Sequence, residues 1–224
     1  MAKVPVKKVS WEEIVEWSRV LADKVKESGY QPSVVVAVAR GGYVPARLVC
    51  DFLGVENLVS IQSQHWTEAA RKAERAVLKF RYKIDLSGHR ALLVDDIVDT
   101  GESLLLAKKH VLEEWRPDEL RIAVLQWISP VAKFRPDYYA IEVKDWVWFQ
   151  YPWTRLEDVT QFIRRMLTEE PPEKEVLSYG EIKERFKQWY GIEVEDYYYR
   201  YALSFLEKQG VLRKLEDDKY LVKR

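Results

Sequence analysis

The sequence contains little of the residue types on which disulfide and metal chemistry depend. Cysteine occurs once in 224 residues, at Cys50, so neither an internal disulfide nor a cysteine-rich zinc site is expected. The three histidines, His65, His89 and His110, are scattered along the chain, which argues against a histidine metal cluster.

The chain also lacks an excess of either charge and has no long hydrophobic run. Lysine and arginine total 36, as do aspartate and glutamate, so no large electrostatic field favours a nucleic acid or an anionic membrane. The N-terminus alternates lysine with small apolar residues and resembles neither a signal peptide nor a membrane span. We therefore expect a soluble cytoplasmic protein. Its length suffices for one full α/β domain and a small appendage.

The most informative stretch is formed by residues 92–104. It begins as an apolar run that ends in the paired carboxylates Asp95 and Asp96, and this pattern predicts a buried strand. A third acid, a Thr-Gly pair and a serine follow, and a helix is expected to begin at Ser103 or Leu104. Ligands of open α/β sheets bind beyond the carboxyl end of such a strand.

The residue types of this loop suit a sugar phosphate. Thr100, Gly101 and Ser103 form a small, hydroxyl-bearing loop whose backbone N–H groups can surround a phosphate at a helix N-terminus. Asp95 and Asp96 would repel a phosphate but accept hydrogen bonds from sugar hydroxyls. A Walker-type loop is excluded, because no Gly-Lys-Ser/Thr follows the strand. A ribose 5-phosphate suits both groups of residues, since its phosphate fits the loop and its hydroxyls fit the two aspartates. The alternative is a solvated acidic turn that caps a helix.

Residues 94–101, Val-Asp-Asp-Ile-Val-Asp-Thr-Gly, resemble the phosphoribosyl pyrophosphate (PRPP) signature of the type I phosphoribosyltransferases over its whole length. The resemblance implies an α/β fold, a Rossmann-like parallel sheet flanked by helices, and a glycosyltransferase (pentosyltransferase) activity. It implies that residues 99–103, Glu102 among them, bind the 5-phosphate, and that Asp99 receives or guides a proton on the base. It also implies Mg²⁺ held mostly by PRPP, with Asp95 as a candidate contact.

A second strand–loop–helix junction lies earlier in the chain. Residues 34–39 are continuously apolar, as is typical of a strand buried on both faces, and residues 44–49 continue as a helix. Between them, Arg40 can neutralise an anion, and Gly41 allows close approach of the backbone. A tight turn with a surface arginine is the alternative. Residues 39–46, however, are similar to the pyrophosphate loop of bacterial xanthine-guanine phosphoribosyltransferases, which implies that Arg40 and Gly41 contact PRPP.

Further strands are expected at residues 58–63, 77–82, 120–125 and 138–143. Their alternation with helices favours a parallel sheet with right-handed crossovers. Residues 64–76 are polar and lie where the family carries a mobile flap. A helical surface excursion is an equally good interpretation, and no individual flap residue can be assigned.

Aromatic residues are concentrated at residues 146–153, a stretch expected to form a loop. They can pack together, or a flat heterocycle can stack on them, which contributes roughly 1–3 kcal/mol per base. The stretch resembles the Trp-x-x-Gln-Pro-Trp segment of xanthine-guanine phosphoribosyltransferases. This implies that Trp148 stacks on a purine and that the backbone near Phe149 binds the purine edge. Those enzymes carry a lysine for the 6-oxo group, but residues 126–130 contain none, and the nearest is Lys133.

A charged, proline-containing linker at residues 169–174 separates two predicted domains, residues 1–168 and 175–224. The second begins with a capping box at Ser178, and two helices and a hairpin then follow, which looks like a small α+β winged-helix module. Such modules are usually associated with DNA. Residues 173–224 hold eleven basic and eleven acidic residues, whereas phosphate tracking needs a basic excess. A structural or oligomer-forming role, in a homo-oligomer such as a dimer, is therefore favoured.

The sequence thus predicts a purine phosphoribosyltransferase of purine salvage, whose substrates are PRPP and a nucleobase. Guanine, xanthine or hypoxanthine is the favoured base, and adenine or a pyrimidine remains an alternative because the usual lysine is missing. A second alternative is a PRPP-sensing transcriptional regulator that has kept the fold and lost catalysis. Asp99 and the aromatic stretch favour the enzyme.

Overall fold

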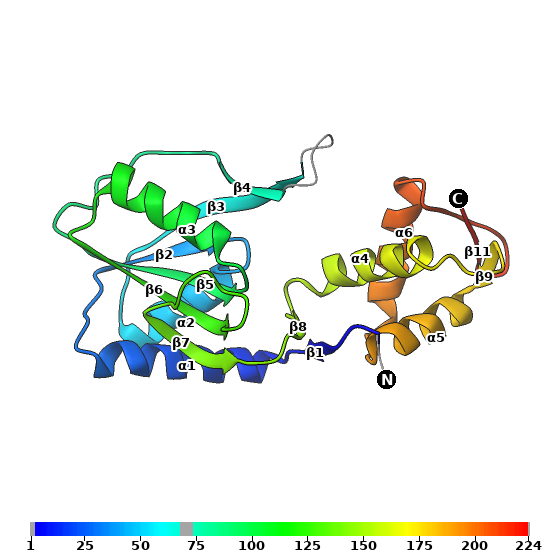
Figure 1. Ribbon diagram of the computed structural model, residues 1–224, viewed down its shortest axis with the longest axis horizontal. Coiled ribbons are helices and arrows are strands. Elements are labelled where there is room, and N and C mark those ends of the chain that lie inside the picture. Colours follow the sequence, from blue (N-terminus) through cyan, green and yellow to red (C-terminus); the bar gives the residue numbers. More distant parts are fainter. Residues whose placement is uncertain (1–2, 68–73, 224) are drawn as a thin grey trace. The chain divides into compact units, whose positions relative to one another are not determined.

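The computed structural model describes residues 3–67 and 74–223 (Figure 1). The chain divides into two compact units, which are described one at a time. We call Trp11–Trp146 the sheet unit, and Met1–Ser10 together with Val147–Arg224 the terminal unit. Among the described residues, no helix combines the length and the apolar character that crossing a membrane requires.

A six-stranded sheet in the order β4-β3-β2-β5-β6-β7 forms the centre of the sheet unit. Its strands are β2 (Val34–Ala39), β3 (Leu58–Thr67), β4 (Glu74–Lys79), β5 (Arg90–Val98), β6 (Glu119–Ile128) and β7 (Tyr138–Val143). All neighbouring strands run parallel except β3 and β4, which are antiparallel. The predicted Rossmann-like parallel sheet is therefore confirmed.

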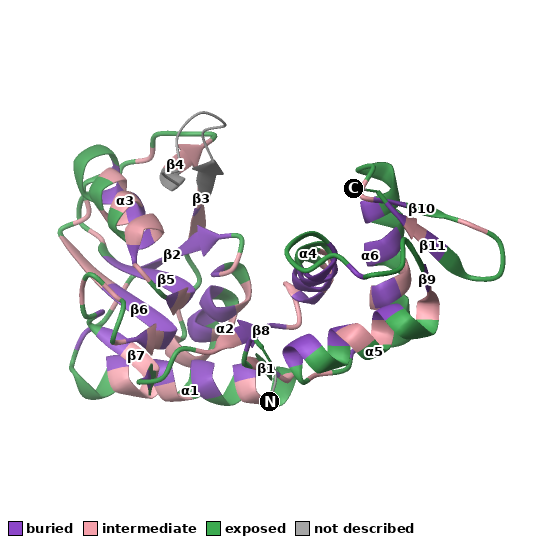
Figure 2. Ribbon diagram, turned by 45° about the vertical axis from the view of Figure 1, so that its right-hand side comes forward, coloured by how far each residue is buried: buried purple, intermediate pink, exposed green. Residues whose placement is uncertain are grey.

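Helices cover both faces of this sheet (Figure 1). Helices α1 (Trp11–Glu27) and α2 (Tyr43–Leu53) pack on one face, and α3 (Glu102–His110), continued by the π-helical turn η1 (Val111–Trp115), packs on the other. All six residues of β2 are buried, because a central parallel strand is covered from both sides. The buried residues accordingly follow the strands and the inner faces of the helices (Figure 2).

The strand order reverses between β2 and β5. The chain passes from β2 to β3 on one side, and β5 then lies on the other side of β2, with Ala37 opposite Val94. At such a switch point, the connections that leave the two carboxyl ends diverge and a crevice forms between them. Both sequence junctions identified above lie at this position.

The terminal unit combines a short parallel pair with an α+β module. Strand β1 (Val6–Lys8) pairs in parallel with β8 (Trp148–Gln150). The module consists of α4 (Arg155–Thr168), β9 (Val176–Ser178), α5 (Tyr179–Tyr190), α6 (Asp196–Lys208), β10 (Leu212–Lys214) and β11 (Lys219–Val222). The last two strands and β9 form an antiparallel sheet in the order β10-β11-β9.

Local signals correctly located α5, α6 and the hairpin of β10 and β11, but not α4 or β9. Ser178 caps α5 as predicted: its Oγ accepts the Glu181 N–H at 3.2 Å, and Glu181 Oε2 accepts the Ser178 N–H at 2.8 Å. The compact unit, however, also contains α4, because α4 packs against α5 and α6 around buried rings such as Phe162 and Tyr190. The division of the structure thus falls before α4, whereas the linker expected from the sequence follows that helix. The winged-helix interpretation stays a prediction.

Candidate functional site

The end of β5 carries two neighbouring buried acids. Asp95 is 9% exposed and Asp96 is 8% exposed, and Asp95 Oδ1 accepts the backbone N–H of Asp96 at 2.9 Å. Burial raises the pKa of the Asp95 carboxyl well above its usual value, and the nearby charges of Asp96 and Asp99 raise it further. The ionised form of Asp95 is therefore disfavoured until hydroxyl donors or a cation approach it.

The loop after β5 leads directly into α3. Asp99 is exposed, and its Oδ1 accepts the Thr100 N–H at 2.5 Å. Gly101 has a left-handed φ of 84° and caps a helix that begins at Glu102, one residue before the earliest predicted start. Because this cap is a glycine, no cap side chain bonds the N–H groups of the first turn, and this arrangement suits a phosphate.

The loop after β2 approaches the same position. It contains a cis peptide between Ala39 and Arg40, and Arg40 is exposed. A Cβ atom at Gly41 would lie 2.6 Å from Cγ of Asp96, so only glycine leaves space for that carboxylate. A Cβ atom at Gly42 would lie 2.5 Å from the carbonyl oxygen of Val94.

The structure therefore brings both predicted loops together at the switch point of the sheet. Arg40 and Gly41 come from one loop, and the residues from Asp95 to Ser103 come from the end of β5, the following loop and the start of α3. Contact is direct, because the Asp96 carboxylate occupies the space beside Gly41. The individual roles assigned to these residues stay predictions.

A third loop, to which the sequence analysis assigned no role, contacts the β5–α3 loop. It joins β6 to β7, and its Phe134 ring lies where a Cβ atom of Gly101 would be. In the same loop, Lys133 forms an ion pair with Glu102. No local pattern marks these contacts, since they join positions about thirty residues apart in a chain whose intervening residues form other elements.

The predicted base-binding residues lie in the terminal unit and in a different local structure from the one expected. Residues 148–150 form strand β8 rather than a loop, because the backbone pairs with β1, and just beyond β1 the Val9 N–H donates to the carbonyl oxygen of Gln150 at 2.9 Å. Trp148 is half-buried and its ring packs edge-on against Phe162, 5.5 Å between centroids. Phe149 is 9% exposed. Packing thus occupies part of this aromatic surface.

The region of the expected flap is only partly described. Strand β3 continues to Thr67, beyond the predicted residues 58–63, and pairs antiparallel with β4, which begins at Glu74. The helical alternative is wrong for the described part of residues 64–76, since these residues are extended. Residues 68–73 lie outside the described residues.

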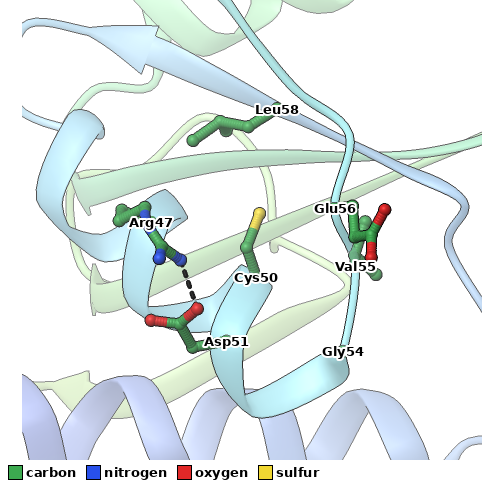
Figure 3. A pocket seen from close by; sticks show the side chains of 7 residues that line it. All are labelled: Arg47, Cys50, Asp51, Gly54, Val55, Glu56 and Leu58. Carbon is green, nitrogen blue, oxygen red and sulfur yellow. Dashed lines mark hydrogen bonds and ion pairs between the residues drawn. The ribbon is translucent and has the colours of Figure 1, made fainter.

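A hollow beside α2 lies away from the two loops. Arg47, Cys50 and Asp51 line it together with residues 54–56 and Leu58 (Figure 3). Arg47 and Asp51 form an ion pair across one turn of α2. Burial raises the pKa of the Cys50 thiol to about 11, so the thiol is protonated and poorly nucleophilic at neutral pH. None of the predicted site residues lines this hollow.

Comparison with known proteins agrees with the geometry. Residues 10–157 match the family model described as the phosphoribosyl transferase domain. Xanthine-guanine phosphoribosyltransferases are 29% identical over 145 residues in Chromohalobacter salexigens and 30% identical over 154 residues in Cereibacter sphaeroides. Each alignment covers 65% of this chain, with 82% of the first relative and 84% of the second.

Solved structures give the same result. A purine phosphoribosyltransferase from Pyrococcus horikoshii Ot3 has a TM-score of 0.58 and 30% identity, over 66% of this chain and 93% of that chain. A hypothetical protein from Neisseria gonorrhoeae with bound ppGpp shares the fold at 23% identity, with a TM-score of 0.60 over 70% of this chain and 93% of that chain. The chain therefore belongs to the phosphoribosyl transferase domain family and is a pentosyltransferase.

Proposed function

We propose that the protein is a purine phosphoribosyltransferase of purine salvage. It transfers the 5-phosphoribosyl group of PRPP to a purine and yields a nucleoside monophosphate and pyrophosphate. The observation that carries this proposal is the direct contact between the two loops, where the Asp96 carboxylate fills the space beside Gly41. Family membership and the purine-specific names of the relatives support it.

Each part of PRPP has a chemical counterpart in the sheet unit. The 5-phosphate binds the loop from Asp99 to Ser103, where the N-terminus of α3 presents N–H groups. The ribose hydroxyls donate to Asp95 and Asp96. The pyrophosphate lies at Arg40 and Gly41, where an exposed guanidinium supplies positive charge and a glycine allows close approach.

Magnesium fits this donor set as a partner of the substrate. Within the ranges that the structure describes, no three acidic, histidine or cysteine side chains are grouped as a metal site. The oxygens of PRPP would supply most ligands, as in the resembling enzymes, and Asp95 would be the protein contact, where a cation would help to ionise its buried carboxyl. The bound ion would neutralise charge on the leaving pyrophosphate.

The protein contributes mainly position and proton transfer. The lone pair of a purine ring nitrogen forms the bond to the anomeric carbon, and the bond to pyrophosphate breaks with its electron pair leaving on oxygen. The purine, which is now positively charged, loses the proton carried by the other nitrogen of its imidazole ring, and the exposed carboxylate of Asp99 accepts that proton. We propose Trp148 as a stacking surface for the base and the Phe149 backbone as a partner of its edge, as in the resembling enzymes.

The surroundings of the enzyme are part of the proposal. We propose a cytoplasmic homo-oligomer, such as a dimer, with no role for membranes or nucleic acid. Exposed aromatic side chains on α6, Tyr197 at 53% and Tyr201 at 57%, supply apolar surface for self-association. Sedimentation of the wild type and of Tyr201→Ser tests this part on its own.

Asp99→Asn tests the central assignment. The substitution keeps the shape of the side chain but removes its basicity, so kcat should fall about a hundredfold. The Kd for PRPP with magnesium, measured by calorimetry, should stay within about twofold, a shift below 0.5 kcal/mol. A parallel loss of kcat and PRPP binding would assign Asp99 a structural role. A wild-type protein that ignores PRPP and magnesium would refute the function, and a panel of bases would identify the acceptor.

A further inference from the structure

Two consecutive residues of the β6–β7 loop contact three consecutive residues of the β5–α3 loop. The backbone N–H of Lys133 donates to the carbonyl oxygen of Thr100 at 3.1 Å, and its Nζ donates to Oε1 of Glu102 at 2.5 Å. Between these contacts, the ring of Phe134 faces Gly101. The proposed phosphate loop is thus held from outside at each of its central residues.

The contact with Phe134 leaves no space for a side chain at Gly101. A Cβ atom there would lie 2.6 Å from Cε1 of Phe134, and the φ of 84° is itself unfavourable for other residues. Phe134 also packs against the buried core on the α3 face of the sheet. The ring therefore lies between the buried core and the turn that precedes α3, and it limits the movement of that turn.

Glu102 presents an electrostatic problem for a phosphate site. It is the first residue of α3, and a carboxylate at this position is favourable for the helix itself. The same carboxylate repels a dianionic phosphate bound at the same helix end, because like charges at short range oppose binding. Lys133 forms an ion pair with this carboxylate, so its positive charge offsets the negative charge that Glu102 places at the helix end.

We propose that Lys133 and Phe134 are positioning residues that brace the phosphate-binding loop, and that Lys133 neutralises Glu102 so that the loop accepts a dianionic phosphate. This inference rests on the proposed function, since it takes the 5-phosphate of PRPP as the ligand of the loop. It adds two residues outside the family signature to the PRPP site, together with the reason why this loop tolerates an acid.

The solvent exposure of the Lys133–Glu102 ion pair determines whether its loss affects folding stability or PRPP binding. The Lys133 side chain is 55% exposed and that of Glu102 is 35% exposed. Ion pairs this open to solvent contribute little to folding. Loss of Lys133 should therefore change the affinity for PRPP while the melting temperature stays the same.

The test compares Lys133→Met, Glu102→Gln and the double variant in the full-length protein. Lys133→Met should raise the KM for PRPP about fivefold, which equals about 1 kcal/mol, with kcat and the KM for the base unchanged. Glu102→Gln should lower the KM for PRPP. The double variant should return close to the wild-type value, because the uncompensated carboxylate is gone. The effect of Lys133→Met should also shrink at high salt.

Lys109→Met is the matched control. Lys109 forms an exposed ion pair with Glu113, at 4.0 Å, within the continuous helix α3–η1. This pair involves no residue of the loop, so its loss should leave the KM for PRPP unchanged. Phe134→Ala should raise the KM for PRPP in a way that Glu102→Gln does not restore, since it removes a steric support and not a charge.

Two outcomes would overturn the inference. A double variant as weak as Lys133→Met would show that Lys133 does not act through Glu102. A KM for PRPP in Lys133→Met equal to that of the control would show that the contact of Lys133 with the loop has no role in binding. Both outcomes require wild-type protein that binds PRPP, whereas wild-type protein that fails to bind it refutes the proposed function itself.

Discussion

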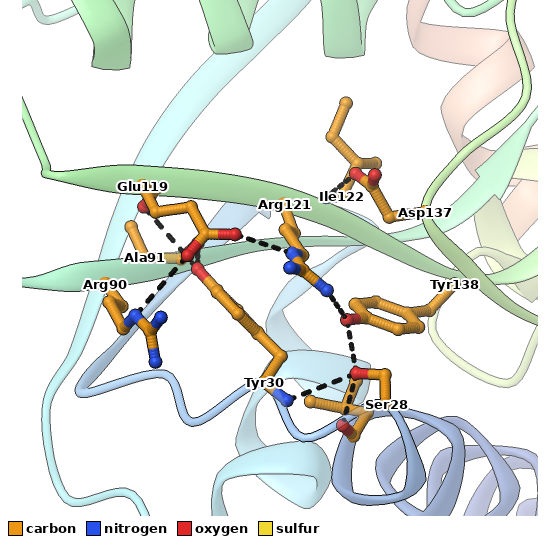
Figure 4. Close-up of polar contacts among 10 residues, drawn as sticks. Ser28, Tyr30, Arg90, Ala91, Glu119, Arg121, Ile122, Asp137 and Tyr138 are labelled. Carbon is orange, nitrogen blue, oxygen red and sulfur yellow. Dashed lines mark hydrogen bonds and ion pairs between the residues drawn. The ribbon is translucent and has the colours of Figure 1, made fainter.

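The two edges of the central sheet are built on different principles. At the amino ends of β5, β6 and β7, polar side chains satisfy one another (Figure 4). Glu119 pairs with Arg90 at 3.4 Å and with Arg121 at 2.8 Å, and the Tyr30 hydroxyl donates to the carbonyl oxygen of Ala91 at 2.8 Å. At the carboxyl ends of β2 and β5, two acids lie side by side in the buried end of one strand, and glycines allow the neighbouring loop to approach.

Burial acts on both edges, but with different consequences. It raises the pKa of the Tyr30 hydroxyl, which is neutral at physiological pH in any case. It also raises the pKa of Asp95, a carboxyl that is ionised in water at the same pH. The polar groups of the amino edge thus have partners within the protein. At the carboxyl edge, ionisation of Asp95 is unfavourable, and a ligand that supplies hydrogen-bond donors or positive charge can relieve this. An unfavourable charge that a ligand can relieve is therefore found at the carboxyl ends of these strands, while both ends contribute contacts that stabilise the fold.

The largest effect on stability should come from Gly42→Ala. The new Cβ atom would meet the carbonyl oxygens of Val94 and Val38 at 2.5 and 2.6 Å, and these are backbone atoms of two central strands that cannot move aside. We expect a loss of about 3 kcal/mol in the free energy of unfolding. Thermal unfolding should show a decrease of roughly 6–12 °C in a chain of this size.

Gly180→Ala is the matched control for this substitution. Gly180 lies in α5 with no atom within 4 Å of its Cβ position, so alanine should leave the melting temperature unchanged or raise it. Equal melting temperatures for the two variants would show that the carboxyl edge is less rigid than the structure indicates.

A smaller effect is expected from Tyr30→Phe at the amino edge. It removes one buried hydrogen bond and keeps the ring, so the free energy of unfolding should fall by about 1 kcal/mol. Because Tyr30 lies at the amino end of β5, at the opposite end of the strand from the proposed site, kcat and both KM values should stay at their wild-type values. Urea unfolding and steady-state kinetics measure the two quantities, and a shift in the KM for PRPP would contradict the separation of the two edges.

The smallest effect on stability should come from Asp95→Asn, and it should be a gain. Since the pKa of Asp95 is higher in the folded than in the unfolded protein, the folded state binds more protons above the ordinary carboxyl pKa, and stability falls as pH rises through that window. Asparagine removes this loss, so the variant should melt about 2 °C higher at pH 7. The difference should vanish near pH 4 and below.

The same variant should bind PRPP more weakly, because a ribose diol loses one of its carboxylate acceptors. Calorimetry with PRPP and magnesium at pH 7 measures this loss. Lower stability of the variant than of the wild type at pH 7 would show that the Asp95 carboxylate does not destabilise the fold. Equal binding of PRPP would show that this carboxylate does not contribute to ligand binding.

The local sequence was sufficient to locate the elements that bear the site. The apolar run at residues 34–39 corresponds to β2, the run that begins at Leu92 and ends in Asp95 and Asp96 lies in β5, and the strand expected at residues 138–143 corresponds to β7. These strands could be predicted because strand burial and helix initiation leave signals within a few neighbouring residues. The aspartates and glycines of both junctions were identified for the same reason.

The remaining features depend on pairings between distant residues. Strand β8 exists because residues near the N-terminus pair with it, and a local pattern rich in aromatic residues looked like a loop instead. Helix α4 joins the terminal unit because its apolar face packs against α5 and α6. No signal within either segment specifies its partner.

The sequence by itself determined the chemistry of the two junctions and the strands that present them, since both are local properties of the chain. Tertiary structure alone decided that Asp96 faces Gly41, that Lys133 meets Glu102, and that the buried position of Asp95 raises its pKa. The physical reason is that charge, burial and steric contact depend on which distant segments the sheet brings together, and a short stretch of sequence carries no record of them.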